Sequence, residues 1–183
     1  VSLSSDGNTV AIGATYNDGN GFQSGHARIY VWNGNIWQQR GLDIDGLHID
    51  ELSGWSVSLS SDGNTVAIGA IFHDTPVSSE AGSVKILEWN GNSWNNIGVS
   101  SQNIANFTGE NNDDHFGFSI SLSSDGNTIV CGAPEESNFG NPTGYVKISN
   151  LPNLTNFNGC DSIVGLNLTI NNSTESHTYF STC

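Results

Sequence analysis

The sequence predicts an all-β protein made of repeated, four-stranded antiparallel sheets. Three observations support this: a composition rich in turn-forming residues, a block of residues that occurs three times, and apolar residues that alternate with polar ones. Charged residues make up 12% of the 183 residues, about half the usual ~25%, and 22 residues are glycine. Since Gly, Asn and Ser favour turns over helices, we expect short strands joined by tight turns.

The block SLSSDGNTVAIGA occupies residues 2–14 and recurs at 58–70, and again at 121–133 with IVC in place of VAI. Around the second copy, Trp55, Val57 and Leu59 alternate with serines. A turn at residues 61–64 then precedes a second alternating run that contains Val66 and Ile68. This pattern is typical of a β-hairpin. By the same alternation, Trp55 and Phe118 are expected in the core.

A second hairpin follows each block. Residues 25–34 (GHARIYVWNG) align with residues 82–91 (GSVKILEWNG), and the third copy starts in the same way at residue 144. Further strands are predicted to begin at Trp37 and Trp94. Four strands per repeat, with spacings of 56 and 63 residues between equivalent aspartates, match the size of a propeller blade, and radial repetition hides sheet edges.

The number of repeats predicts an open or partial ring. The second repeat, at about residues 54–98, is complete, whereas the first begins inside its first strand and the third loses the pattern after Ile148. Closed propellers usually need about 4 to 8 blades. Because the chain contains no Met, we expect it to be an interior piece of a longer protein.

Two short motifs resemble the FG-GAP signature. Phe116-Gly117 precedes the third block, and Gly132 to Pro134 ends it. Ser53-Gly54 and Gly69 to Ile71 stand at these places in the second repeat, and Gly13 to Thr15 in the first. Over residues 1–150 the chain resembles the integrin-α-type β-propeller repeat as found in secreted bacterial proteins. The resemblance implies a location outside the cell or on its surface.

The predicted loops fall into two sets, on opposite faces of the ring. The two hairpin turns of each repeat are short, whereas the loops at 15–24, 71–81 and 134–143 and the crossovers at 42–53 and 99–116 are long. Twelve of the 18 acids lie in the long set: Asp18, Asp43, Asp45, Asp50, Glu51, Asp74, Glu80, Glu110, Asp113, Asp114, Glu135 and Glu136. Because long loops on rigid scaffolds commonly bind ligands, we predict a ligand-binding face that contains Asp18, Asp45, Asp50, Glu51, Asp74, Asp113, Asp114 and Glu135.

No cofactor is predicted, and calcium is the one candidate considered. The resemblance implies a calcium loop in the first hairpin, but the turn has a single carboxylate, too few for such a loop. Paired acids recur at Asp50-Glu51 and Asp113-Asp114, shortly before a glycine. They either bind Ca²⁺ weakly or solvate and cap the loop. His48, His73 and His115 lack zinc-ligand spacing, so a zinc site is not expected.

Neither catalysis nor binding of nucleic acid is expected. The serines lie on strands without a nucleophile elbow, and no acid differs from its repeat equivalents. The formal charge of −14 repels phosphate, and no apolar run approaches the ~18 residues of a membrane helix. Among the remaining features, Cys131 is predicted to be a buried apolar residue. Arg28, Lys85 and Lys147 share one strand position and are expected to pair laterally or to be solvated.

Residues 151–183 are predicted to begin a second unit. Leu166 and Leu168 alternate with polar residues, which indicates a strand. Residues 159–170 resemble Cys-containing, Ig-like β modules of surface proteins from Bacteroidetes-type bacteria. Cys160 and Cys183 pair with each other or with cysteines elsewhere, and either pairing implies an oxidising, extracellular location.

These observations together predict a non-catalytic propeller segment that serves adhesion or ligand binding through its acidic long-loop face. Its expected partners are an extracellular protein or glycan and the remaining blades of the same chain. Two alternatives remain: an ancillary propeller of a secreted enzyme whose catalytic domain lies elsewhere, and a structural spacer.

Overall fold

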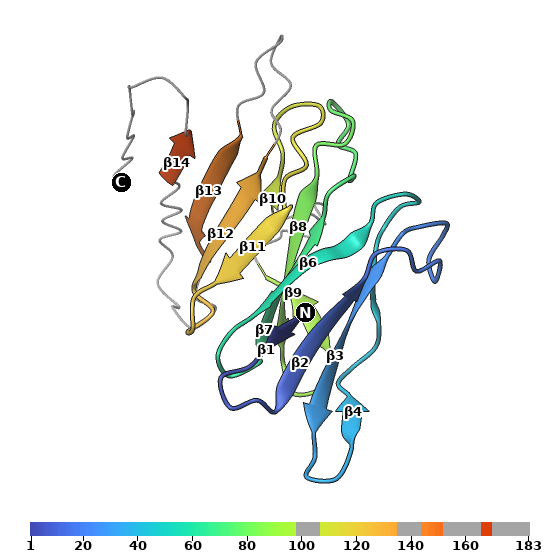
Figure 1. Ribbon diagram of the computed structural model, residues 1–183, viewed down its shortest axis with the longest axis vertical. Helices are drawn as coiled ribbons and strands as arrows, with labels where there is room; N and C mark the ends of the chain where they lie inside the picture. Colours follow the sequence, from blue (N-terminus) through green and yellow to red (C-terminus); the bar gives the residue numbers. More distant parts are fainter. Residues whose placement is uncertain (98–106, 135–143, 152–165, 170–183) are drawn as a thin grey trace.

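The computed structural model is all-β and contains three antiparallel sheets (Figure 1). It describes residues 1–97, 107–134, 144–151 and 166–169. Sheet 1 contains β1 (Ser2–Leu3), β2 (Thr9–Ala14), β3 (His26–Trp32), β4 (Trp37–Gln39) and β5 (Ile44–Asp45). Sheet 2 contains β6 (Ser53–Leu59), β7 (Thr65–Ala70), β8 (Ser83–Trp89), β9 (Trp94–Asn96) and β10 (Phe107–Thr108). Sheet 3 contains β11 (Ser119–Leu122), β12 (Thr128–Ala133), β13 (Tyr145–Asn150) and β14 (Leu166–Thr169).

The predicted all-β class and the sequential pairing of strands within each repeat are confirmed, with one difference at the outer edge. In sheet 1 both β4 and β5 pair with β3, so the outer strand consists of two pieces. Sheet 2 repeats this arrangement, with β9 and β10 both paired with β8. Residues 44–45 and 107–108, which were predicted to be parts of loops, are therefore strand residues.

The third sheet takes its outer strand from the predicted second unit. β14 pairs with β13 in antiparallel register, with Leu168 opposite Val146. This strand was predicted as part of a separate β module, and in the structure it pairs with the edge of sheet 3. The boundary at residue 150 and the pairing of Cys160 with Cys183 stay predictions, because residues 152–165 and 170–183 lie outside the described part.

Sheet 2 lies between the other two sheets (Figure 1) and shares an apolar core with each. Its strand β7 is buried on both faces. Val66 and Ile68 pack in the core with residues of sheet 1, whereas Ala67 packs in the core with residues of sheet 3. Cys131 is in this second core and 1% exposed, which confirms the prediction that it is buried.

The repeated block forms a turn whose polar atoms bond within the repeat. In sheet 2, the Ser60 hydroxyl donates to Asp62 Oδ1 at 2.6 Å and accepts from the Thr65 N–H at 2.9 Å. Asp62 also accepts from the backbone and side-chain N–H groups of Asn64. The same bonds occur in the other two turns. Each turn aspartate therefore stabilises its own hairpin.

The same block also bonds each repeat to the next. The Ser5 N–H donates to Ser61 O, and the Ser61 N–H donates to Ser124 O, both at 2.9 Å. Within the strands, the Ser2 hydroxyl accepts from the Leu59 N–H at 2.9 Å, and the Ser58 hydroxyl accepts from Leu122 at 3.0 Å. The serines predicted as ordinary strand residues thus carry the hydrogen bonds between sheets.

Glycines of the two FG-GAP-like motifs meet across adjacent sheets. A Cβ added at Gly69 would collide with the backbone carbonyl of Gly117, and one at Gly13 would collide with that of Gly54. Ser56 closes the same contact, since its hydroxyl donates to Gly117 O at 2.6 Å. The backbones approach closely because no side chain separates them.

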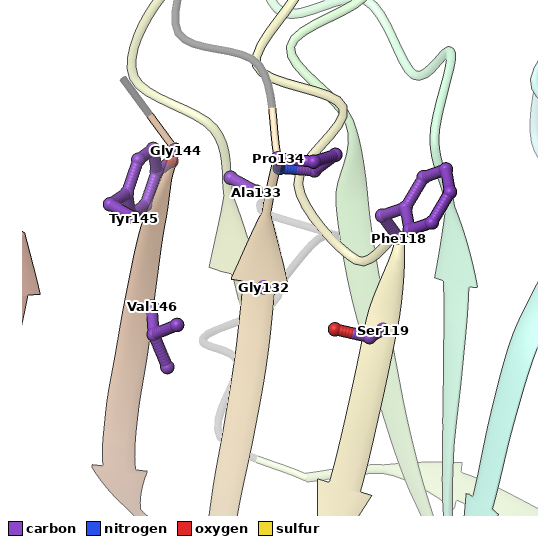
Figure 2. A pocket seen from close by; sticks show the side chains of 8 residues that line it. All are labelled: Phe118, Ser119, Gly132, Ala133, Pro134, Gly144, Tyr145 and Val146. Atoms are coloured by element: carbon purple, nitrogen blue, oxygen red, sulfur yellow. The ribbon is translucent and has the colours of Figure 1, made fainter. Parts of the chain in front are cut away.

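The equivalent glycine of sheet 3, Gly132, lies in an open hollow of about 340 Å³ (Figure 2). A Cβ added there would meet only the hydroxyl of Ser119, within the same sheet. The remaining lining residues include Phe118, Pro134, Tyr145 and Val146. In the described part of the chain, this glycine has no neighbouring sheet of the kind that covers Gly13 and Gly69.

The prediction that Trp55 and Phe118 lie in the core is wrong, since the two residues are 39% and 45% exposed. The register of β6 against β7 shifts between Ser53 and Val57, which marks a β-bulge or similar irregularity. At Trp55 this shift breaks the period-two alternation on which the prediction depended. The two rings instead contact each other, with centroids 5.5 Å apart.

Gly69→Ala is expected to lower the free energy of unfolding by about 1–3 kcal/mol, because the new methyl group collides with the backbone of the next sheet. The matched control is Gly132→Ala, where only a rotatable hydroxyl is in the way. Denaturant unfolding of both variants measures the difference. Equal losses would contradict the inter-sheet explanation.

Candidate functional site

The long loops lie together at one end of the sheets, at the top of Figure 1, and the short hairpin turns lie at the other. We call residues 15–24, 46–52, 71–81 and 109–115 the long-loop face. Its loops connect β2 to β3, β5 to β6, β7 to β8, and β10 to β11. Glu135 and Glu136, from the predicted loop at 134–143, lie outside the described residues.

Backbone hydrogen bonds join these loops in a pattern that repeats between sheets. The Asp50 N–H donates to Phe22 O at 2.8 Å, and Asp113 donates to Ser79 O at 3.0 Å. Both aspartates have positive φ angles, 57° and 60°. The Phe72 N–H donates to Glu51 O at 3.3 Å and so joins the loops of sheets 1 and 2. The long-loop face is therefore a connected surface.

The predicted acid pairs separate into one outward and one buried member. Glu51 is 2% exposed, and its Oε2 accepts from the backbone N–H groups of Leu47 and His48. Asp114 is fully buried, and its Oδ2 accepts from the N–H groups of Glu110 and Asn111. These bonds favour the alternative in which the paired acids cap the loop. Calcium binding at Asp50, Glu51, Asp113 and Asp114 stays a prediction.

Glu51 also bonds to a histidine of the next loop. Its Oε1 lies 2.8 Å from His73 Nδ1, and His73 is itself buried. Burial pushes the pKa of Glu51 up, but the bonds from His73 and from the backbone of His48 outweigh it and leave the pKa below its usual value. The carboxylate is thus held ionised and fully engaged inside the loop.

The side-chain hydrogen-bond partner of Asp114 is a tyrosine, whereas that of the equivalent Glu51 is a histidine. The Tyr145 hydroxyl donates to Asp114 Oδ2 at 3.1 Å. Burial and the adjacent Asp114 raise the pKa of Tyr145 far above its usual value. Tyr145 therefore acts as a neutral hydrogen-bond donor that joins β13 to the preceding crossover.

Two further predicted residues, Asp18 and Asp74, hold equivalent places in the loops of sheets 1 and 2. Asp18 Oδ1 accepts from the Gln23 N–H, and Asp74 Oδ1 accepts from the Glu80 N–H, both at 2.8 Å. Both aspartates are exposed and so retain oxygen atoms for a ligand. Asp50 is also exposed, and Asp113 is partly exposed.

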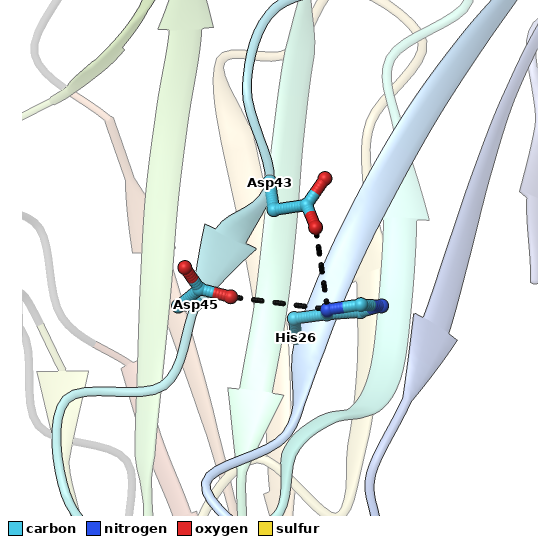
Figure 3. A group of neighbouring side chains, drawn as sticks. All are labelled: His26, Asp43 and Asp45. Carbon is cyan, nitrogen blue, oxygen red and sulfur yellow. Dashed lines mark ion pairs between the residues drawn. The ribbon is translucent and has the colours of Figure 1, made fainter. Parts of the chain in front are cut away.

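Asp45 belongs to a different group of side chains, which the sequence pattern does not predict. His26 Nδ1 lies 3.7 Å from Asp43 Oδ2 and 3.8 Å from Asp45 Oδ1 (Figure 3). His26 and Asp45 are opposite each other in the pairing of β3 with β5. Because β5 was predicted to be a loop, the sequence offered no reason to place these two side chains together.

The three basic residues that share one strand position, Arg28, Lys85 and Lys147, pair laterally, which was one of the two predicted outcomes. Arg28 donates to both oxygens of Asp43, at 2.9 and 2.7 Å. Lys85 donates to the backbone carbonyl of Asp45 at 2.8 Å, and Lys147 lies 3.7 Å from Glu110. Lys85 and Lys147 thus contact the preceding repeat, whereas Arg28 pairs within its own sheet.

The long-loop face also exposes apolar side chains that charge counting did not reveal. Tyr16, Phe22 and Ile49 are each more than 60% exposed, and Val77 is 89% exposed. Exposed aromatic and aliphatic side chains among polar groups are common at binding surfaces. A signal was available in the sequence, since these residues stand alone in polar loops.

A scan against models of protein families found no match to the chain, and a search of curated proteins also found none. A search of the described residues for a helical membrane span found none.

Replacement of the buried acid in Glu51→Gln is expected to lower the free energy of unfolding by about 1–3 kcal/mol, because an amide cannot accept all the hydrogen bonds of the carboxylate. Glu88→Gln, on strand β8, is the matched control and is expected to change it by less than about 0.5 kcal/mol. Thermal and denaturant unfolding measure both. A loss no larger than that of the control would contradict the capping role.

The Arg28–Asp43 pair is expected to add stability that acid removes. The bonds from Arg28 hold the pKa of Asp43 at about 2, below its usual 3.8. Because the folded pKa is depressed, the stabilisation is complete above about pH 4 and is lost as the pH falls towards 2. The difference in unfolding free energy between wild type and Asp43→Asn, in metal-free buffer, is therefore expected to shrink over that range.

Arg28→Met removes the same pair and is expected to flatten the same part of the pH profile. Adding Asp43→Asn to Arg28→Met should then cost little more. A wild-type advantage over Asp43→Asn that does not change with pH would exclude the ion pair as its source.

Proposed function

We propose that the chain is a segment of an extracellular β-propeller that binds a protein or glycan ligand, without catalysis, through the long-loop face. The observation that carries this proposal is the joined set of loops, which exposes acids and apolar side chains together. Side chains such as Phe22 and Asp18 share one loop there, whereas the described hairpin turns at the opposite end are short. A rigid, mixed polar and apolar surface is suited to recognition.

The propeller architecture is supported by the way in which the sheets stack. Each sheet contacts the next through the same glycine and serine positions, so a further repeat would bind by the same contacts. The hollow at Gly132 occupies the position at which Gly13 and Gly69 contact the next sheet. It is therefore the expected binding position for the glycine of a further repeat. We therefore propose that its occupant is a further blade of the same protein.

The FG-GAP resemblance fits this proposal, because the two halves of the motif touch across neighbouring sheets. Gly69, from the second half in one repeat, meets Gly117, from the first half in the next. A repeat protein that depends on this contact requires small residues at both places. The resemblance and the predicted disulfide cysteines support a location outside the cell or on its surface.

A structural spacer is the second candidate function. It is favoured by the number of acids that bond within the loops, among them Glu51 and Asp114. An ancillary propeller of a secreted enzyme would use the same face for substrate attachment. In that case the chain would bind the substrate polymer of its catalytic partner.

The test is binding of the chain to an array of glycans and extracellular-matrix proteins. We expect a bound ligand whose affinity falls by about tenfold in Asp50→Asn/Asp113→Asn, because both carboxylates are accessible and Asn tolerates their positive φ angles. Phe22→Ala is expected to weaken binding by a similar factor.

Glu88→Gln, on strand β8, is the control and should bind as wild type does. No ligand on the array would favour the spacer. Binding that survives all the loop substitutions would place the site elsewhere on the chain.

A further inference from the structure

We propose that His26, Asp43 and Asp45 form a binding site for a divalent transition-metal cation such as Zn²⁺. His26 begins β3, Asp45 lies opposite it on β5, and Asp43 immediately precedes β5. One donor atom from each residue lies within 4.8 Å of the other two. The site is separate from the acid pairs considered for calcium.

The distances match what such a cation needs. His26 Nδ1 lies 3.7 and 3.8 Å from the nearest oxygens of Asp43 and Asp45. Ligand atoms about 2.1 Å from a tetrahedral zinc ion are about 3.4 Å apart. Small side-chain rotations would bring the three atoms to this spacing, and a water molecule can supply a fourth ligand.

The buried nitrogen of His26 also supports a metal site. The His26 side chain is 5% exposed, and Nδ1 is buried without a hydrogen-bond partner. Figure 3 shows this nitrogen directed at the two carboxylates. Buried polar atoms in folded proteins nearly always have a partner. A cation bound between the three atoms would give this nitrogen the partner that it lacks and would neutralise the two carboxylates beside it.

Neighbouring side chains orient Asp43 as outer-shell residues orient metal ligands. Arg28 donates to both of its oxygens, and Gln39 donates to Oδ1 at 2.7 Å. Each carboxylate oxygen has two lone pairs, so Oδ2 can bind Arg28 and a metal ion together. The Arg28 pair also depresses the pKa of Asp43. The carboxylate is therefore ionised and fixed in place before a metal ion arrives.

The mixed donor set distinguishes between metals. An imidazole nitrogen with two carboxylates suits Zn²⁺, and also Mn²⁺ or Co²⁺. Ca²⁺ prefers six to eight oxygen ligands, and His26 supplies nitrogen. We therefore expect selectivity for transition metals over Ca²⁺.

Sheet 2 shows which residues the fold accepts at these places. Ser83 takes the position of His26, and Thr108 takes that of Asp45, since they pair with each other in the same register. Neither residue is charged. The double substitution His26→Ser/Asp45→Thr thus replaces the site by residues that an equivalent sheet already contains.

The experiment titrates the whole chain, freed of metal by a chelator, with Zn²⁺, Co²⁺ and Ca²⁺, followed by calorimetry and thermal unfolding. We expect one Zn²⁺ per chain and a melting temperature that rises by roughly 5–10 °C at a hundredfold excess over the dissociation constant. Co²⁺ should give a visible absorption band of a nitrogen- and oxygen-ligated ion, and Ca²⁺ should give no shift.

His26→Ser/Asp45→Thr should remove the Zn²⁺ shift, while Glu88→Gln, a change of charge outside the site, should keep it. An unaltered melting temperature in metal-free buffer shows that the double variant is folded. Absence of a Zn²⁺ shift in wild type would overturn the proposal. An equal Zn²⁺ shift in the double variant would also overturn it, since the metal would then bind elsewhere.

Discussion

The stacking of the sheets depends on direct backbone contact between glycines of neighbouring repeats. At Gly13 and Gly69, a strand of one repeat lies against the carbonyl group of the glycine that opens the next repeat. The absence of a side chain brings the strands close enough for the serine hydrogen bonds beside them. Apolar burial of Val66, Ile68 and their neighbours then fills the two cores on either side of sheet 2. Without the glycine contact, the sheets would be too far apart for either set of interactions.

The long-loop face follows from that stacking. The crossover between sheets 1 and 2 bonds to the loop of its own sheet through Asp50 and to the loop of the next sheet through Glu51. Two of the loop carboxylates, those of Glu51 and Asp114, are buried and hold loop backbone together. The acids that remain exposed lie beside Phe22, Ile49 and Val77. A count of acids alone overstates how much charge a ligand would meet.

The sequence was sufficient for the parts of the fold that depend on local repetition. The block of serines, aspartate and glycine predicted each inner hairpin, since the aspartate of the turn bonds to side-chain and backbone groups within two residues of it. It could not predict that the outer strand is split, or that β6 shifts register near Trp55, because those features are set by contacts with other strands. The group at His26 was missed for the same reason. Its aspartates are distant in sequence, and only the pairing of β5 with β3 brings them to the histidine.

The hydrogen bonds between the serine turns point in one direction. Ser5 donates to Ser61, and Ser61 donates to Ser124, so each repeat presents a donor on one side and an acceptor on the other. Such an interface is heterologous, and two copies of one side cannot pair about a two-fold axis. Units that join in this way either close into a ring or continue as an open filament. The angle between successive sheets, rather than the strength of their contact, decides which of these two assemblies forms.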